Sequence, residues 1–316
     1  MTIAILCSGQ GAQHAGMFRL TGELPEAEPV FAAAAEALDG RDPRRLVVDA
    51  HRDLHEDRVA QVLCCTAALA AWSVLEPSVD DAIVLAGYSI GELAAWGCAG
   101  LLDATTVMRL AVVRAEAMDD AAGLGSGLLA LRGLPRPSVD ALCVEHACDV
   151  AIIDGPRSFV VGGARDDLER LGADALARGA SRAVRLPVAV ASHTPRLAPA
   201  SERFRTALAP LSLPARVKPG VRLLRGIDGR AVFDVLEGKT ALAAQIAHSI
   251  DWARCLEACR EALVTTVLEL GPGRALASMA SEVMPGARCR SLDDFSSIAG
   301  ARRWLEDEVH RQALVR

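Results

Sequence analysis

A serine flanked by small residues stands where a short apolar segment gives way to a helical pattern. Ser89 lies in the pentapeptide GYSIG at 87–91, after the apolar run 82–86 and before a helix predicted over 91–99. Glycines on both sides permit a sharp turn that lifts a serine hydroxyl clear of the backbone, and the helix N-terminus favours negative charge there. The pattern predicts a covalent serine nucleophile. The alternative is a solvated serine in an ordinary strand-to-helix turn.

A serine hydroxyl attacks only when a base takes its proton, and His193 is the best placed of the seven histidines. It follows the apolar run Pro187–Ala191, so we expect it at the end of a strand, where α/β proteins place their active sites. The other six lie near polar or charged residues, where a solvated side chain is expected: His14, His51, His55, His146, His248 and His310. Of these, His51 and His55 are spaced for one helix face, but they lack a third ligand and predict no metal site.

An arginine interrupts the apolar face of the helix predicted from Asp103 to about Asp119. Apolar side chains recur there at spacings of three, four and seven, and Arg114 lies in the same stripe as Val107, Leu110, Ala111 and Met118. A guanidinium binds a carboxylate through two parallel hydrogen bonds, so Arg114 is a candidate receptor for an acidic substrate group. The alternative is an arginine that reaches the surface or pairs with a buried carboxylate.

These residues need strands and helices to hold them, and the pattern predicts an α/β fold. Ile3–Cys7 and Ala82–Ala86 are continuous apolar runs that end in glycine-rich turns, as buried parallel strands do. A further strand is expected at Thr266–Leu270, before Gly271-Pro272-Gly273. Strand, tight turn and helix in succession predict a parallel-sheet, hydrolase-like large domain.

A different pattern covers residues 125–187. A strand at Leu128–Leu131, a helix after Pro137, two strands on either side of 154–156, a helix at 164–178 and a strand at Arg182–Leu186 give the order βαββαβ. That order predicts a ferredoxin-like small domain. The large domain is therefore expected to be discontinuous, formed by residues 1–124 and 188–316, with the small domain inserted.

The composition excludes several classes of function. The net charge is −6, the arginines are scattered and aromatic residues make up only 3%, so neither a basic footprint nor a stacking surface for nucleic acid is expected. The nine cysteines lack a regular spacing and several lie in apolar segments, which favours free, buried, reduced thiols.

The sequence predicts a cytoplasmic protein without a membrane segment. The first apolar run, Ile3–Cys7, has no basic flank and is too short for a signal peptide, so a first strand is expected. The longest uncharged stretch, Val59–Leu75, contains Gln61, Thr66 and Ser73 and falls short of a membrane span.

The motifs occur in an order and spacing that resemble a known family. The chain is similar to the malonyl-CoA:acyl carrier protein transacylases and to the acyltransferase domains of polyketide and fatty acid synthases. The resemblance covers nearly the whole chain and rests on GQGAQ at 9–13, GYSIGE at 87–92, Arg114, Ser192-His193, Gln245 seven residues before Trp252, and ELGPG at 269–273.

The resemblance implies a catalytic role for Ser89, His193 and Gln10. Ser89 matches the nucleophile of the family and His193 matches the general base. Gln245 matches a position that helps to orient the histidine. The family places no aspartate behind its histidine, and the sequence shows no obvious one.

The substrate-binding residues that the resemblance implies are Arg114, Ile90 and Gln245. Gln10 and the backbone amide of Ile90 match the oxyanion hole, and Arg114 matches the residue that holds the malonyl carboxylate. The implied reaction is a ping-pong exchange from malonyl-CoA, through a serine ester, to the phosphopantetheine-type thiol of an acyl carrier protein. No metal or redox cofactor is implied.

One residue departs from the family. Tyr88 stands before the nucleophile, where the family usually has histidine. Together with Leu223–Gly229, it makes the chain resemble the epsilon subunit of malonate decarboxylase, which primes the carrier subunit of that enzyme with malonyl groups. The resemblance therefore implies malonate decarboxylation or, alternatively, fatty acid or polyketide synthesis.

Two other readings remain open at the level of sequence. An α/β-hydrolase of the esterase or thioesterase type also has GxSxG with serine before histidine, although it usually has an acid between them. A subunit without activity could keep the fold as a binding platform, although it would not need Gln10, Ser89, Arg114 and His193 together.

Overall fold

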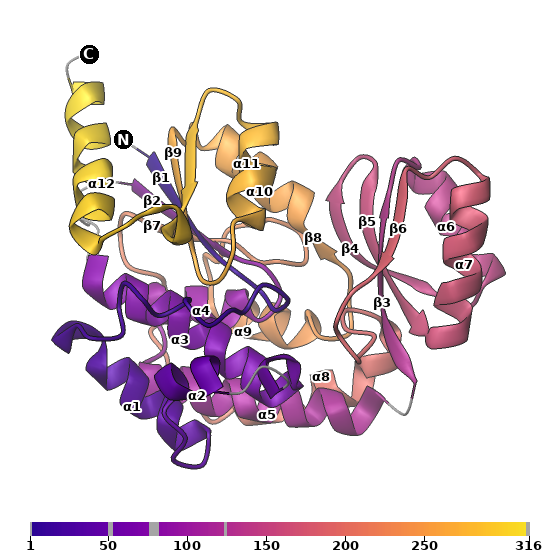
Figure 1. The fold of residues 1–316 in the computed structure, drawn as a ribbon, viewed down its shortest axis with the longest axis horizontal. Helices are drawn as coiled ribbons and strands as arrows, with labels where there is room; N and C mark the ends of the chain where they lie inside the picture. The colour runs from indigo at the N-terminus through magenta and orange to yellow at the C-terminus, as the bar shows by residue number, and fades with distance from the viewer. Residues whose placement is uncertain (1, 50–52, 76–81, 123–124, 314–316) are drawn as a thin grey trace.

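The computed structural model describes residues 2–49, 53–75, 82–122 and 125–313, and it shows two sheets side by side (Figure 1). His51 lies outside the described residues. The large sheet is parallel, with the strand order β10-β9-β1-β2-β7. Its strands are β1 (Thr2–Cys7), β2 (Ala82–Gly87), β7 (Val221–Leu223), β9 (Thr266–Leu270) and β10 (Arg288–Ser291).

Helices cover both faces of the large sheet, which explains why its central strands β1 and β2 are mainly apolar. Along β1, Ile3 and Ile5 pack into one core, whereas Ala4 and Leu6 pack into the other. The first core includes α1 (Glu28–Ala37), α2 (Pro43–Asp49), α3 (Asp57–Leu75), α4 (Gly91–Cys98), α5 (Ala104–Ala122), α8 (Ala198–Leu208), α9 (Val235–Ala244) and α12 (Ile298–Ala313). The second includes α10 (Trp252–Glu261) and α11 (Ala275–Val283).

The second sheet has the predicted βαββαβ order. Its elements are β3 (Ser126–Arg132), α6 (Arg136–Glu145), β4 (Asp149–Gly155), β5 (Ser158–Ala164), α7 (Arg165–Ala177) and β6 (Arg182–Arg185). They form an antiparallel sheet in the order β6-β3-β5-β4, with both helices packed against it. This confirms the predicted fold class, a parallel-sheet α/β domain with a ferredoxin-like insert.

One strand joins the second sheet from outside the predicted insert. The short strand β8 (Ile250–Asp251) pairs in parallel with β4. We therefore propose that the boundaries 1–124, 125–187 and 188–316 divide the two domains, with β8 as a connection between them.

The predicted strand before His193 is absent from the described residues. Leu186 makes the last ladder contact, through its N–H to Leu128, and residues 187–193 then run without strand structure. Pro187 has no N–H to donate, and Val190 and Ala191 are buried against the core rather than in a sheet. The expectation that a strand end positions His193 is therefore wrong.

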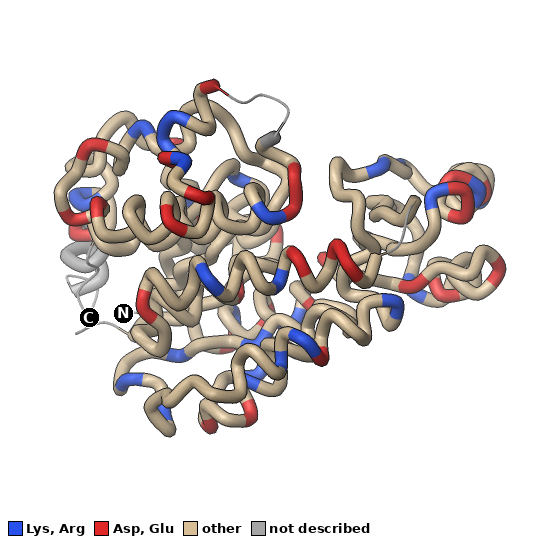
Figure 2. Tube along the Cα trace, turned by 90° about the horizontal axis from the view of Figure 1, so that it is seen from below, with Lys and Arg blue, Asp and Glu red and all other residues tan. Residues whose placement is uncertain are grey.

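The described residues also include short 3₁₀ helices at Pro25–Ala27, Asp53–His55, Pro195–Leu197 and Leu292–Asp294. Eight of the nine cysteines are buried and Cys289 is partly buried. Helix α3 has the length and hydropathy of a membrane span, but 83% of that window is buried inside the structure, as in a core helix. In Figure 2, cationic and anionic residues are interspersed along the trace of the chain, in agreement with the scattered charge of the sequence.

Candidate active site

The turn after β2 has the sharp geometry that the sequence predicts. Ser89 has a φ of +55°, in the left-handed region, and the side chain is half-buried. The neighbouring glycines have no room for a side chain: a Cβ on Gly87 would lie 2.1 Å from the backbone of Gly91, and one on Gly91 would lie 2.1 Å from the carbonyl oxygen of Cys7. The turn is therefore packed against both β1 and α4, which holds Ser89 at the end of β2.

His193 lies directly against this serine. The Ser89 hydroxyl is 2.8 Å from Nε2 of His193, and Nδ1 of the same ring is 2.6 Å from the carbonyl oxygen of Gln245. A carbonyl only accepts, so Nδ1 carries the proton and Nε2 is free to accept from the serine. His193 also has a positive φ of 63°, and its N–H donates to Ile246. A loop contact with the segment after α9, rather than a strand end, sets the position of the imidazole.

Gln245 connects the other groups of the site. Its side-chain amide donates to the backbone carbonyl of Ser89 at 3.0 Å and to Glu92 at 2.7 Å, and its oxygen accepts from Arg114 at 3.1 Å. The side chain is 1% exposed, so these bonds are shielded from water. Gln245 thus contacts the serine turn through its side chain and His193 through its backbone.

Arg114 is buried beside the serine, on the apolar face of α5 as the sequence predicts. It is 2% exposed, donates to Gln61 at 2.8 Å and to Gln245, and lies 3.4 Å from the Ser89 hydroxyl. Burial lowers the pKa of Arg114, while the nearby Asp57 and Glu92 favour its charged form. Both direct partners are neutral amides, so the cation can still bind an anion next to Ser89.

The predicted oxyanion donors are Gln10 and Ile90. The side-chain amide of Gln10 donates to Asp57 at 2.6 Å, so it is already engaged. Within the part of the chain that the structure describes, the backbone N–H groups of Gln10 and Ile90 have no acceptor. These two backbone N–H groups are therefore available for an oxyanion.

Three residues of this network escaped the sequence prediction. Asp57 accepts from Gln10 and from Gln61 at 2.9 Å, and Glu92 accepts from Gln245 and from the N–H of Gly226 at 3.0 Å. Burial raises the pKa of Asp57, and burial raises the pKa of Glu92 to about 7. Each of these two carboxyl groups is therefore linked to Arg114 through one amide side chain, Gln61 for Asp57 and Gln245 for Glu92.

The environment keeps His193 neutral. Burial, together with the charge of Arg114, lowers its pKa to about 3, although the bond to Gln245 acts in the opposite direction. A neutral imidazole that accepts from a serine can take its proton at neutral pH. The site can therefore form and resolve a serine ester, with a cation beside the ester.

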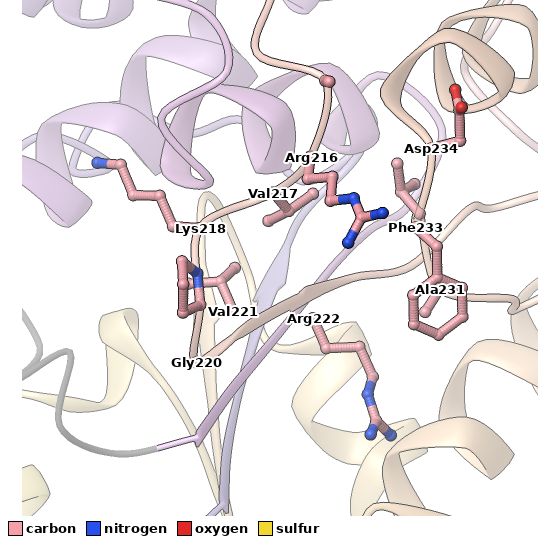
Figure 3. Close-up of a pocket in the computed structure, with 12 residues that line it drawn as sticks. Arg216, Val217, Lys218, Gly220, Val221, Arg222, Ala231, Phe233 and Asp234 are labelled. Carbon is pink, nitrogen blue, oxygen red and sulfur yellow. The ribbon is translucent and has the colours of Figure 1, made fainter.

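Other clusters lie apart from this site. The cavity in Figure 3, of about 690 Å³, is lined by residues 215–222 and 231–234, and Arg216 and Arg222 flank Phe233 there, without a nucleophile and base in contact. Glu145, His146 and Asp174 could together hold a metal ion by geometry, but His146 pairs with Asp174 at 2.8 Å and Glu145 pairs with Arg178.

Comparison with known proteins identifies the family. Residues 5–221 match the acyl transferase domain family. The chain belongs to that family. A malonyl CoA-acyl carrier protein transacylase from Mycobacterium bovis is 30% identical over 294 residues, which cover 92% of this chain and 96% of that protein.

Solved structures of acyl transferases agree with the fold. An acyl-carrier-protein S-malonyltransferase from Burkholderia pseudomallei superposes with a TM-score of 0.86 at 29% identity and covers 96% of this chain and 100% of its own. A malonyl-transacylase in complex with a type II polyketide synthase acyl-carrier protein has a TM-score of 0.88 at 27% identity and covers 96% and 99%. The contact between Ser89 and His193 is consistent with the membership of this chain in the acyl transferase family.

Proposed function

We propose that this acyl transferase moves a malonyl group from malonyl-CoA to the thiol of an acyl carrier protein, through an ester on Ser89. The observation that carries the proposal is the buried guanidinium of Arg114, which donates to the amides of Gln61 and Gln245 and, at 3.4 Å, to the Ser89 hydroxyl, all of them neutral groups. A malonyl group has a free carboxylate near its thioester carbon. Arg114 can bind that carboxylate while Ser89 meets the thioester.

The first half of the reaction acylates the serine. Ser89 attacks the thioester carbonyl as His193 takes its proton, and the N–H groups of Gln10 and Ile90 bind the oxyanion. The carbon–sulfur bond then breaks, and the coenzyme A sulfur leaves with the proton from His193. In the second half the carrier thiol gives its proton to His193 and attacks the ester, and the proton returns to Ser89 as its oxygen leaves. The exchange needs no cofactor.

We further propose that the acceptor is the carrier subunit of malonate decarboxylase in the cytoplasm. This assignment rests on Tyr88 and on residues 223–229, which resemble the epsilon subunit of that enzyme. Fatty acid or polyketide synthesis is the alternative, and it would be supported if carrier proteins of those pathways were the better acceptors.

Intact-mass analysis tests the proposal directly. Wild-type protein exposed to malonyl-CoA should gain one malonyl group, and Ser89→Ala should gain none. Ser181→Ala, at an exposed serine of the small domain, is the matched control and should acylate normally. Absence of an adduct on the wild type would instead favour a binding platform without activity.

Adding the carrier separates transfer from hydrolysis. The ester should persist without a carrier and disappear when a carrier thiol is supplied, with the malonyl mass then found on the carrier. Rapid release of free malonate without a carrier would favour a thioesterase. Paired reactions with the decarboxylase carrier subunit and a fatty acid carrier protein would identify the preferred acceptor.

A further inference from the structure

Tyr88, the residue before the nucleophile, contacts the small domain. Its hydroxyl donates to Asp154 on β4 at 3.1 Å. Its ring packs edge-to-face on Trp252, with the ring centroids 5.4 Å apart and the planes at 77°. Trp252 is fully buried at the start of α10. The turn that carries Ser89 is thus tied to a strand of the other sheet.

The same strand is also tied to the histidine side of the site. Ile152 and Ile153 of β4 pair with the two residues of β8, and the carbonyl of Val150 accepts from the hydroxyl of Ser249. Only a few residues earlier in that segment, the carbonyl groups of Gln245 and Ile246 bind His193. The chain from 245 to 252 therefore joins the imidazole to β4 and ends on the ring of Tyr88.

Two routes thus lead from β4 to the reacting pair. One runs through Asp154 and Tyr88 to Ser89, and the other runs through β8 and Gln245 to His193. We propose that β4 braces the active site: it fixes the serine turn relative to the histidine, and Tyr88 and Asp154 are positioning residues for the step in which Ser89 attacks. The inference deepens the proposed acyl transfer and rests on it for its natural substrate.

The geometry makes a specific claim about the hydroxyl of Tyr88. The ring is held by Trp252, so removal of the hydroxyl leaves the packing intact and breaks only the link to Asp154. A hydrogen bond to a carboxylate is stronger than one between neutral groups. Its loss should let the turn move relative to His193, which slows attack without changing the contacts of the bound acyl group.

Tyr88→Phe and Asp154→Ala test the brace by single-turnover acylation with malonyl-CoA, since each removes one partner of the hydrogen bond. Each should lower the acylation rate by about tenfold, the size expected for one charged hydrogen bond. The KM for malonyl-CoA should stay within about twofold. The double variant should be no slower than the slower single variant, because both remove the same link. Asp149→Ala, on the same strand but paired with Arg196, is the matched control and should acylate at the wild-type rate.

Labelling of Ser89 by a small sulfonyl fluoride gives a readout that needs no acyl substrate. Rates are expressed per folded molecule, with the folded fraction taken from thermal unfolding curves. The variants should label about tenfold more slowly than wild type. Three results would each overturn the brace. They are labelling of the variants at the wild-type rate, rate losses that multiply in the double variant, and a raised KM with an unchanged acylation rate. A wild type that labels but forms no malonyl ester would refute the proposed function alone.

Discussion

Arg114 differs from the surface arginines in the kind of partner it has. Many of those pair with carboxylates, for example Arg44 with Glu28 and Arg203 with Asp120. Arg114 binds two amides instead, and the carboxyl groups of Asp57 and Glu92 lie beyond them. A directly paired arginine would have to break an ion pair to bind a substrate carboxylate. The two amide side chains hold the guanidinium in place but do not neutralise its charge.

Arg114→Ala should remove the preference for malonyl over acetyl groups. Loss of a buried charged contact costs about 2–5 kcal/mol, so malonyl transfer should fall by more than tenfold while acetyl transfer changes little. Acylation rates with malonyl-CoA and acetyl-CoA measure the effect. Arg109→Ala, at an exposed position of the same helix, is the matched control. Unchanged selectivity in Arg114→Ala would exclude the receptor role.

His193 should give an unusual dependence of rate on pH. An ordinary histidine base loses activity as the pH falls through about 6.5. The pKa of His193 is lowered to about 3, so the neutral base persists and the sulfonyl fluoride labelling rate should not fall between pH 7 and pH 5 on its account. In Arg114→Ala one cause of the lowered pKa is removed, and the acid limb should move to higher pH. A labelling rate of the wild type that fell with a midpoint near pH 6.5 would contradict the lowered pKa of His193.

At the scale of elements, the turn between β2 and α4 has no room for a side chain at either of its glycines. A Cβ on Gly87 or Gly91 would fall on backbone atoms, which cannot move aside as a flexible side chain can. Gly87→Ala should therefore cost about 3 kcal/mol or more of unfolding free energy, at or above the upper end of overpacking costs, and should abolish labelling of Ser89. Denaturant unfolding measures the first effect. Gly155→Ala, where a Cβ meets no atom within 4 Å, should change neither.

Much of the fold follows from apolar runs that end in glycine. The predicted Thr266–Leu270 is β9 to the residue, and the helix predicted at 164–178 is Arg165–Ala177. The strand predicted at 187–191 is absent because an apolar composition indicates burial and not strand pairing. Residues that are buried outside a sheet show the same composition. Whether an apolar run joins a ladder depends on which strands lie beside it, and that is a tertiary property.

The supporting residues of the site were harder to predict than the reacting ones. Asp57 and Gln61 lie four residues apart in α3, a helix that is otherwise mainly apolar. Two polar side chains on one face of such a helix are a signal, since a buried polar group needs a partner. Their partners, Gln10 and Arg114, are remote in the sequence, so the spacing alone could not name them.

At the scale of the whole molecule, two buried carboxyl groups couple stability to pH. Glu269 accepts from the hydroxyl of Ser8 and from the N–H of Ala277, which fixes β9 to β1 and α11, and Glu92 fixes the serine turn to Gln245. Burial raises the pKa of each to about 7, above the ordinary value of 4.5. Between these values the folded chain keeps a proton that the unfolded chain has lost. Each group therefore lowers stability as the pH rises from about 4.5 to 7.

Glu269→Gln should reveal this coupling, because glutamine keeps the shape of the side chain and cannot ionise. A raised pKa of this size corresponds to a few kcal/mol, so the stability of the variant relative to wild type should improve by on the order of 3 kcal/mol between pH 5 and pH 8. Urea unfolding at the two pH values measures the difference, and any constant cost of a lost acceptor cancels in the comparison. Glu26→Gln, at an exposed glutamate, should track the wild type at both values. If Glu269→Gln also tracked the wild type, Glu269 would ionise in the folded protein as readily as in the unfolded chain, and the link between β9, β1 and α11 would be independent of pH.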